Sequence, residues 1–336
     1  MTAEERKKAR IRRLIESRHA RRLALGGMLS VSGAGAALST QPPSRPTRKA
    51  YDDPVKEAVA RTMVERLAGR GWDLPNLDHQ RVDHFVDRFT NDPGMRHRLE
   101  VFLTRSGRYL PMISAKLEER DMPHDLIFLA MIESGFDPTA YSHAHASGLW
   151  QFIAATGRSF GLRVDSEVDE RNHPEKATDA ALDYLRTLHD RFGSWYLAAA
   201  AYNTGEGRVA TAMREVTGSD RATGEEAYYR IWDRLPGETR DYVPLMIAAA
   251  RIAKEPMRYG FGHVVPDEPA DVREVEVQPG TTLAAVADEA GADVDELKEL
   301  NPHLKRGRAP RDEPYTIKVP TEALGRISST SPVLAP

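Results

Sequence analysis

One glutamate lies where a carboxyl group could act as an acid. Glu133 follows the apolar run from Leu126 to Ile132, and Asp121 with Pro123 suit the cap and first turn of a helix. A helix that is apolar on every side must be buried, so its last carboxyl group is partly stripped of water. Loss of water raises a carboxyl pKa towards the range useful for donating a proton. We therefore predict that Glu133 is a general acid; an ordinary exposed glutamate is the alternative.

A second carboxylate, Asp137, follows Glu133 closely. Hydrolytic glycosidases pair two carboxylates, one as acid and the other as nucleophile or base. Gly135 and Pro138 should stop the helix within about one turn, so we expect Asp137 to have left the face that carries Glu133. A hydrolytic enzyme that uses both carboxylates stays an alternative.

A metal site is not expected. His143 and His145 could form a metal pair, but no acidic residue or third histidine lies at a useful spacing nearby, which favours surface histidines. The chain contains no cysteine. This excludes disulfides, thiol catalysis and thiolate metal sites, and we expect no lipoprotein anchor.

The length and composition allow two domains with tails. The chain has 336 residues, of which 40% are hydrophobic, and a formal net charge of -3. The hydrophobic content supports a sizeable core, and the charge gives no reason to expect nucleic acid as a partner. No apolar run reaches the roughly 18 residues of a membrane-spanning helix.

The N-terminal part resembles an export signal. Residues 1–40 begin with a basic segment, continue with a short apolar stretch and contain small residues, so we expect an exported protein, periplasmic or associated with the cell envelope. A disordered basic tail is the alternative. Residues 41–50 should form a linker, and 51–120 should form amphipathic helices that brace the core.

The rest of the chain divides into a helical region and a small mixed region. Helical periodicity continues over 121–265, which predicts a nearly all-α domain. After a linker at 266–271, residues 272–320 read as strand, helix, helix and strand. Residues 321–336 should be a disordered tail. We therefore expect a mainly α protein with a small α+β module of βααβ order.

Three separated sequence blocks resemble one enzyme family. They are ESGFDP at 133–138 with ASGLWQF at 146–152, AYNTGEG at 201–207, and LPGETRDYVP at 235–244. In this order they resemble the signatures of soluble-lytic-transglycosylase-type domains, which implies a lysozyme-like helical fold. Residues 272–320 resemble a degenerate LysM module, for which we expect binding to glycans that contain N-acetylglucosamine; a module that only packs on the catalytic domain is the alternative. The layout resembles the membrane-bound lytic murein transglycosylase D group.

The resemblance implies cleavage of the β-1,4 bond between N-acetylmuramic acid and N-acetylglucosamine, with a 1,6-anhydro end as product. One carboxyl group is enough because the C6 hydroxyl of the same sugar can attack, at a high effective molarity. Glu133 would protonate the glycosidic oxygen and then accept the hydroxyl proton. No cofactor is needed.

The resemblance also implies supporting residues. Ser142, Ser147, Gln151 and Asn203 match positions that hydrogen-bond the sugar or the catalytic carboxyl group, and Tyr202 and Tyr242 match aromatic positions beside the cleavage point. The serines could instead be turn residues, and the tyrosines could be core aromatics. The expected partner is the glycan strand of peptidoglycan, with a loose association with the envelope membrane. A goose-type-lysozyme-like muramidase and a non-catalytic peptidoglycan-binding protein are the alternative functions.

Overall fold

The computed structural model describes residues 71–327, 333 and 334 and divides them into two compact units. The first, here called the helical unit, comprises 71–136 and 191–268. The second, the mixed unit, comprises 137–190 with 269–327, 333 and 334. Each unit is discontinuous in sequence. The predicted signal at 1–40, the linker at 41–50 and the first part of the brace lie outside the described residues.

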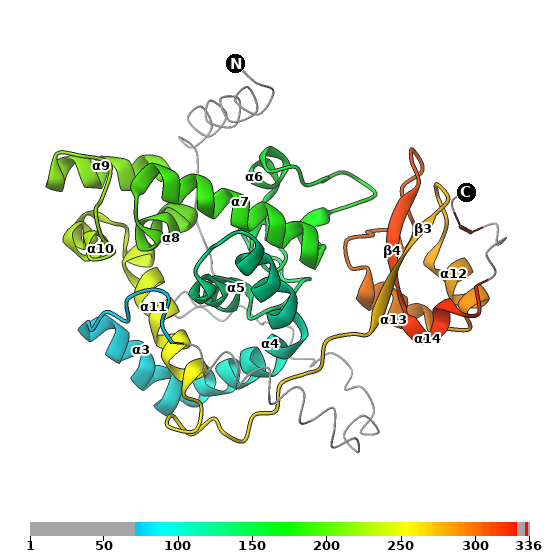
Figure 1. Ribbon diagram of the computed structural model, residues 1–336, viewed down its shortest axis with the longest axis horizontal. Helices are drawn as coiled ribbons and strands as arrows, with labels where there is room; N and C mark the ends of the chain where they lie inside the picture. Colours follow the sequence, from blue (N-terminus) through cyan, green and yellow to red (C-terminus); the bar gives the residue numbers. More distant parts are fainter. Residues whose placement is uncertain (1–70, 328–332, 335–336) are drawn as a thin grey trace. The chain divides into compact units, whose positions relative to one another are not determined.

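The helical unit is assembled around one long helix, α11. This helix packs against α3, α5 and α8, and α4 packs against α3 and α5 (Figure 1). None of the helices in the described residues combines the length and the apolarity that a membrane crossing requires. The elements of this unit are α3 (Gln80–Asn91), α4 (Pro93–Glu119), η2 (His124–Leu126), α5 (Ile127–Ser134), α8 (Trp195–Thr204), α9 (Glu206–Thr217), α10 (Ala227–Arg230), η4 (Trp232–Arg234) and α11 (Gly237–Lys254).

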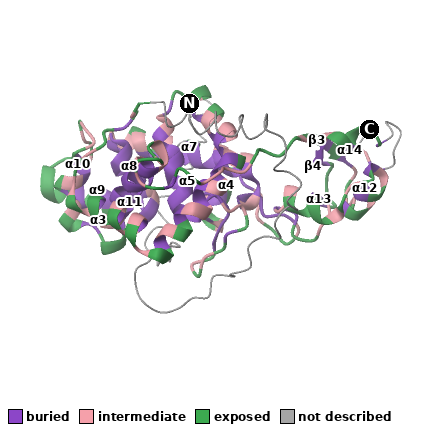
Figure 2. Cartoon of the chain, turned by 90° about the horizontal axis from the view of Figure 1, so that it is seen from below, coloured by how far each residue is buried: buried purple, intermediate pink, exposed green. Residues whose placement is uncertain are grey.

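Helix α5 is the most completely buried of the predicted elements. Each of its residues is buried, and Figure 2 shows α5 largely in the colour of buried residues. It begins later than its sequence suggests, because a 3-10 turn, η2, precedes it and neither Asp121 nor Pro123 caps it. Asp125 in that turn instead accepts hydrogen bonds from the backbone of Asp73 and Leu74, both at 2.9 Å. The start of α5 is therefore held by long-range contacts rather than by a local cap.

The mixed unit contains two small antiparallel sheets. Strand β1 pairs with β2 in a short hairpin, and β3 pairs with β4 from Val272 opposite Pro320 to Val277 opposite Tyr315. The mainly helical fold and the βααβ order of the C-terminal module are thus confirmed. The elements are β1 (Ala146–Ser147), β2 (Phe152–Ile153), α6 (Ala154–Ser159), η3 (Glu170–Asn172), α7 (Pro174–Phe192, to residue 190 in this unit), β3 (Val272–Val277), α12 (Leu283–Ala290), α13 (Val294–Leu300), β4 (Tyr315–Pro320) and α14 (Thr321–Leu324).

The C-terminal segment differs from the disordered tail that we expected for 321–336. In its described residues it forms α14, and Ile327 and Val333 belong to the buried core of the βααβ module. Val333 also accepts a backbone hydrogen bond from Gln278, at 3.0 Å. The few apolar side chains of a Ser/Pro-rich segment cover the module, which composition alone does not reveal.

One buried ion pair in the helical unit gives a stability prediction. Lys254 Nζ lies 2.7 Å from Asp125 Oδ1, and both side chains are buried. Asp125→Asn leaves the lysine buried without its counter-charge, which costs about 3–5 kcal/mol. We expect a correspondingly lower unfolding midpoint in urea, followed by circular dichroism.

The matched control is Asp78→Asn. Asp78 also pairs with a cation, Arg251, at 2.7 Å, but its side chain is 95% exposed. Exposed pairs contribute about 0–1 kcal/mol, so the control should unfold almost as the wild type does. Equal effects of the two substitutions would show that burial of the Asp125 pair does not matter.

Candidate active site

Glu133 is the last but one residue of α5, and its side chain is almost inaccessible. It is 4% exposed. Gly135 ends the helix in the left-handed region at a φ of 61°, and its N–H donates to the carbonyl of Met131 at 2.9 Å. A Cβ at Gly135 would lie 2.0 Å from the ring of Phe102, so both conformation and space require glycine. The chain therefore turns away directly after delivering the carboxyl group.

The surroundings of Glu133 favour its neutral form. Burial raises the pKa of Glu133 to about 8, although a hydrogen bond from Tyr242 lowers it, and the charge of Glu238 raises it further. Tyr242 on α11 donates its hydroxyl to Glu133 Oε1. Among the described residues no lysine or arginine forms an ion pair with Glu133. At neutral pH the group thus holds a proton, and the oxygen not bound by Tyr242 can present it.

Two further predicted residues of the helical unit lie on α8. Asn203 is buried, and its Oδ1 accepts a hydrogen bond from Thr239 Oγ1 on α11 at 2.8 Å. Tyr202 is half-buried. Burial raises the pKa of Tyr242 well above its ordinary value, and Glu133 and Tyr202 add to this effect. Helices α5, α8 and α11 therefore bring four of the predicted site residues into one unit.

The two predicted serines lie in the mixed unit, at the β1–β2 hairpin. The hydroxyl of Ser142 accepts a hydrogen bond from the backbone N–H of Ala146 at 3.1 Å, which is a turn contact. Ser147 is buried and donates to Asn172 Oδ1 at 2.6 Å. Both hydroxyls therefore hold the hairpin in its present form.

Gln151, also in the mixed unit, has an unusual backbone conformation. Its φ is 47°, in the left-handed region that residues other than glycine seldom adopt. Its Nε2 donates to the carbonyls of Ala140 and Gly148, at 3.1 and 3.0 Å. Strained residues of this kind persist only where their surroundings hold them, and they concentrate at functional sites.

Two residues considered for other kinds of site, Asp137 as a second carboxylate and His145 as a metal ligand, have local partners. Asp137 Oδ1 accepts hydrogen bonds from the N–H and the hydroxyl of Thr139, at 2.9 and 2.7 Å, as in an Asx turn. His145 Nδ1 lies 2.7 Å from the hydroxyl of Tyr141. These contacts give Asp137 and His145 turn and surface roles.

Sequence reasoning missed three contributors. Glu238 and Thr239 lie within the third block, and the block itself could have drawn attention to them. Arg171 carries no local signal: it is a buried arginine, and it donates to the carbonyls of His145 and Phe152, at 2.7 and 2.9 Å.

A separate cavity of 520 Å³ lies near the N-terminus of α11 and is lined by residues that include His79, Trp232 and Arg240. Two charged side chains that line this cavity, Arg81 and Asp241, form a bidentate ion pair with N–O distances of 2.6 and 2.7 Å. That pair joins α3 to α11, so we assign these two residues a structural role.

Comparison with known proteins matches two families. The family described as "Transglycosylase SLT domain" matches residues 111–223, and the family described as "Lytic transglycosylase MltD, LysM-like domain" matches residues 271–334. The expected resemblance to both is thereby confirmed. The first match draws on both compact units, and the second lies in the mixed unit.

Individual relatives agree with these matches. Membrane-bound lytic murein transglycosylase D of Escherichia coli is 37% identical over 72% of this chain and 52% of its own length. Membrane-bound lytic murein transglycosylase C of Haemophilus ducreyi is 28% identical over 62% of this chain and 55% of its own length. The chain thus spans about half the length of these relatives. A solved structure of the lytic transglycosylase Slt from Pseudomonas aeruginosa is 24% identical over 47% of this chain and 25% of that one, with a TM-score of 0.36.

The raised pKa of Glu133 predicts how stability depends on pH. The unfolded chain releases this proton near pH 4.5, whereas the folded chain keeps it until about pH 8. The free energy of unfolding therefore falls as pH rises through this window, and Glu133→Gln removes that loss. We expect Glu133→Gln to gain on the order of 2–4 kcal/mol relative to wild type between pH 5 and pH 8, measured by urea unfolding.

Glu118→Gln, at an exposed position of α4, is the control and should show a difference from wild type that is constant across this pH range. A Glu133→Gln difference that is equally flat would mean that the carboxyl group is already ionised at pH 5.

Proposed function

We propose that this chain, which carries a transglycosylase SLT domain followed by an MltD-type LysM-like domain, is a peptidoglycan lytic transglycosylase. Its substrate is the glycan strand of the cell wall, cut between N-acetylmuramic acid and N-acetylglucosamine. The product carries a 1,6-anhydro end. The observation that carries the proposal is the buried Glu133, whose pKa is raised by burial and which is held by Tyr242 at the end of α5.

The geometry supports one carboxyl group acting twice. Glu133 first donates its proton to the glycosidic oxygen, and the bond from that oxygen to C1 of the muramic acid breaks. Tyr242 keeps its hydrogen bond to Glu133 Oε1 and stabilises the carboxylate that results. The C6 oxygen of the same sugar then bonds to C1 and gives its proton to Glu133, which restores the acid. No water is consumed, and no second carboxylate takes part.

The remaining predicted residues have supporting roles in this proposal. Asn203 and Tyr202 stand on α8, which packs against the helix that carries Tyr242. Gln151, Ser142 and Ser147 belong to the β1–β2 hairpin and the loop before it, whose contacts keep these polar groups in a defined arrangement. We propose that they bind sugar hydroxyl and acetamido groups.

We place this activity at the cell envelope. Peptidoglycan lies outside the cytoplasm, and the relatives from Escherichia coli and Haemophilus ducreyi are both described as membrane-bound. The signal-like segment at 1–40 would export the chain.

The direct test is Glu133→Gln on purified sacculi. Loss of the acid should lower the release of 1,6-anhydro-muropeptides by about 10²–10⁴-fold, measured by mass spectrometry, because the amide has no proton to give at the glycosidic oxygen. Retained binding to sacculi and an unchanged circular dichroism spectrum are the controls. Reducing ends in the wild-type products would instead support a hydrolytic muramidase, and wild-type release by Glu133→Gln would exclude Glu133 as the acid.

The pH profile of kcat/KM gives a second test. The free enzyme needs Glu133 protonated, so kcat/KM should fall about tenfold per pH unit above roughly pH 8. Tyr242→Phe removes the hydrogen bond that stabilises the carboxylate, so the alkaline limb of the profile, where kcat/KM falls, should move to higher pH.

Tyr229→Phe provides the matched control. The Tyr229 hydroxyl has no hydrogen-bond partner among the described residues, so its loss should leave the limb in place. A limb near pH 4–5 in the wild type, or a downward shift in Tyr242→Phe, would contradict the assignment of the acid.

A further inference from the structure

The LysM-like module, here residues 271–327 with 333 and 334, forms backbone hydrogen bonds with a segment of the SLT domain. We call residues 163–176 the support segment. Its Asp169 N–H donates to the carbonyl of His303 at 2.9 Å, and Lys305 N–H donates to the carbonyl of Glu167 at 3.0 Å. Val168, between them, is fully buried within the module's own hydrophobic core. A residue of the support segment therefore completes the core of the module.

Polar and ionic contacts that are buried or partly buried reinforce this junction. Glu170 Oε1 accepts hydrogen bonds from Tyr315 at 2.9 Å and from Lys176 at 2.6 Å, and Lys318 of the module pairs with Glu175. Burial by itself raises the pKa of Glu175, but His173 and Lys318 lower it to about 2. The pair of Lys318 and Glu175 is partly buried, and removing one partner leaves the other charge partly withdrawn from water, so the pair favours this register.

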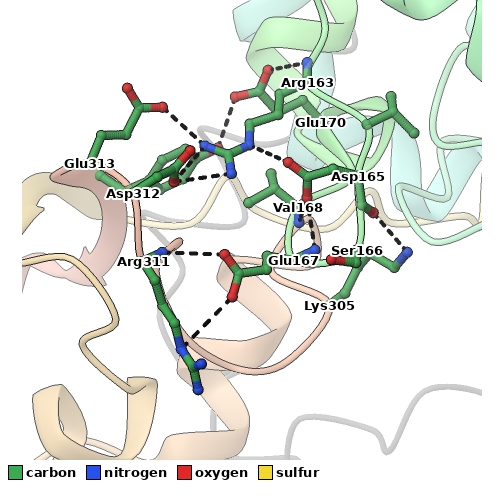
Figure 3. A network of polar contacts seen from close by, with 12 residues as sticks. Arg163, Asp165, Ser166, Glu167, Val168, Glu170, Lys305, Arg311, Asp312 and Glu313 are labelled. Carbon is green, nitrogen blue, oxygen red and sulfur yellow. Dashed lines mark hydrogen bonds and ion pairs between the residues drawn. The ribbon is translucent and has the colours of Figure 1, made fainter.

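Exposed contacts surround the buried ones. Figure 3 shows Arg163 of the support segment directed at Asp312 and Glu313 of the module, with distances of 3.1 and 3.0 Å. Glu167 accepts a hydrogen bond from the backbone of Arg311 at 3.2 Å. Each exposed contact contributes little free energy, but together they fix the orientation of the module on the segment.

The same segment also holds the β1–β2 hairpin. Asp169 and Arg171, both buried, form a bidentate pair at 2.8 and 2.7 Å. Arg171 then donates to backbone carbonyls at both ends of the hairpin, as described above, and a Cβ at Gly148 would lie 1.8 Å from the carbonyl oxygen of Arg171. A displacement of the support segment must therefore displace the hairpin as well.

We propose that the LysM-like module is a fixed support for the substrate-side hairpin, with Asp169 and Arg171 as positioning residues. The module holds the backbone of Asp169, Asp169 orients Arg171, and Arg171 holds the β1–β2 hairpin, which carries Ser147 and Gln151. The part of the module that contacts the support segment is covered by that segment and is not free to bind a glycan. The role of the hairpin in catalysis rests on the proposed function, whereas the mechanical link between module and hairpin does not.

The test compares two lysines of the module in the full-length chain. Lys318→Met removes the buried partner of Glu175, whereas Lys298→Met removes an exposed lysine that pairs with Asp295 at 2.7 Å. The substrate is a short soluble glycan fragment of peptidoglycan, which measures the chemistry without retention on sacculi. We expect Lys318→Met to lower kcat/KM by about tenfold or more and Lys298→Met to leave it unchanged, because small misplacements at an active site can cost up to about 10²-fold.

A rescue variant and hydrogen exchange separate positioning from unfolding and from binding. Glu175→Met together with Lys318→Met replaces the partly buried pair by apolar side chains and should recover most of the activity, whereas Glu175→Met alone should not. The amides of residues 145–153 should exchange at least tenfold faster in Lys318→Met and at the wild-type rate in Lys298→Met. This measurement needs no activity, so it still tests the inference if the wild type releases no anhydro product and the proposed function fails.

Unchanged hairpin exchange and unchanged kcat/KM in Lys318→Met, with weaker retention on sacculi, would overturn the proposal. That result would make the module a tethered binding domain.

Discussion

A carboxyl group at the end of a buried apolar helix, with no cationic partner in the part of the chain that the structure describes, is the constraint on which the helical unit depends. Burying all of α5 requires neighbours on every side, and α4 and α11 supply two of them. The helix also ends one residue after Glu133, at Ser134. Gly135 provides that ending in a conformation and a space that exclude a side chain. Tyr242 then supplies the polar contact without adding a charge.

The sequence of α5 predicts its own C-terminus but not its beginning. Glycine and proline are strong local signals, so the stop after Glu133 follows from the residues themselves. The beginning depends on Asp125, whose partners Asp73, Leu74 and Lys254 lie far away in sequence. No local pattern marks such a residue as buried, since a lone aspartate before an apolar run usually reads as an exposed cap.

The site residues also divide into those that a local sequence signal predicts and those that it does not. Glu133 is identifiable from its position after an apolar run, and Tyr202, Asn203 and Tyr242 only from a resemblance to known signatures. The short-range periodicity of 272–320 is enough to predict its βααβ order. The contact between this module and 163–176 joins residues such as Tyr315 and Glu170 that are 145 positions apart, and each looks ordinary in its own surroundings. Periodicity describes which face of an element is buried, but it does not identify the partner that buries it.

Three glutamates of the two units show how protonation is controlled within one chain. Glu133 and Glu170 are buried and Glu175 is partly buried, which by itself raises the pKa of each. Lys176 lowers the pKa of Glu170, and His173 with Lys318 lowers that of Glu175, so these two carboxylates stay charged and hold a junction. Glu133 accepts a hydrogen bond from the neutral hydroxyl of Tyr242, and among the described residues no lysine or arginine pairs with it, so its pKa stays raised. Burial is therefore common to both kinds of site, and the presence of a cationic partner decides whether the glutamate is charged or is available for the proton transfer that we propose for Glu133. A lysine placed beside Glu133 would lower the pKa of the proposed acid and turn it into a charged carboxylate.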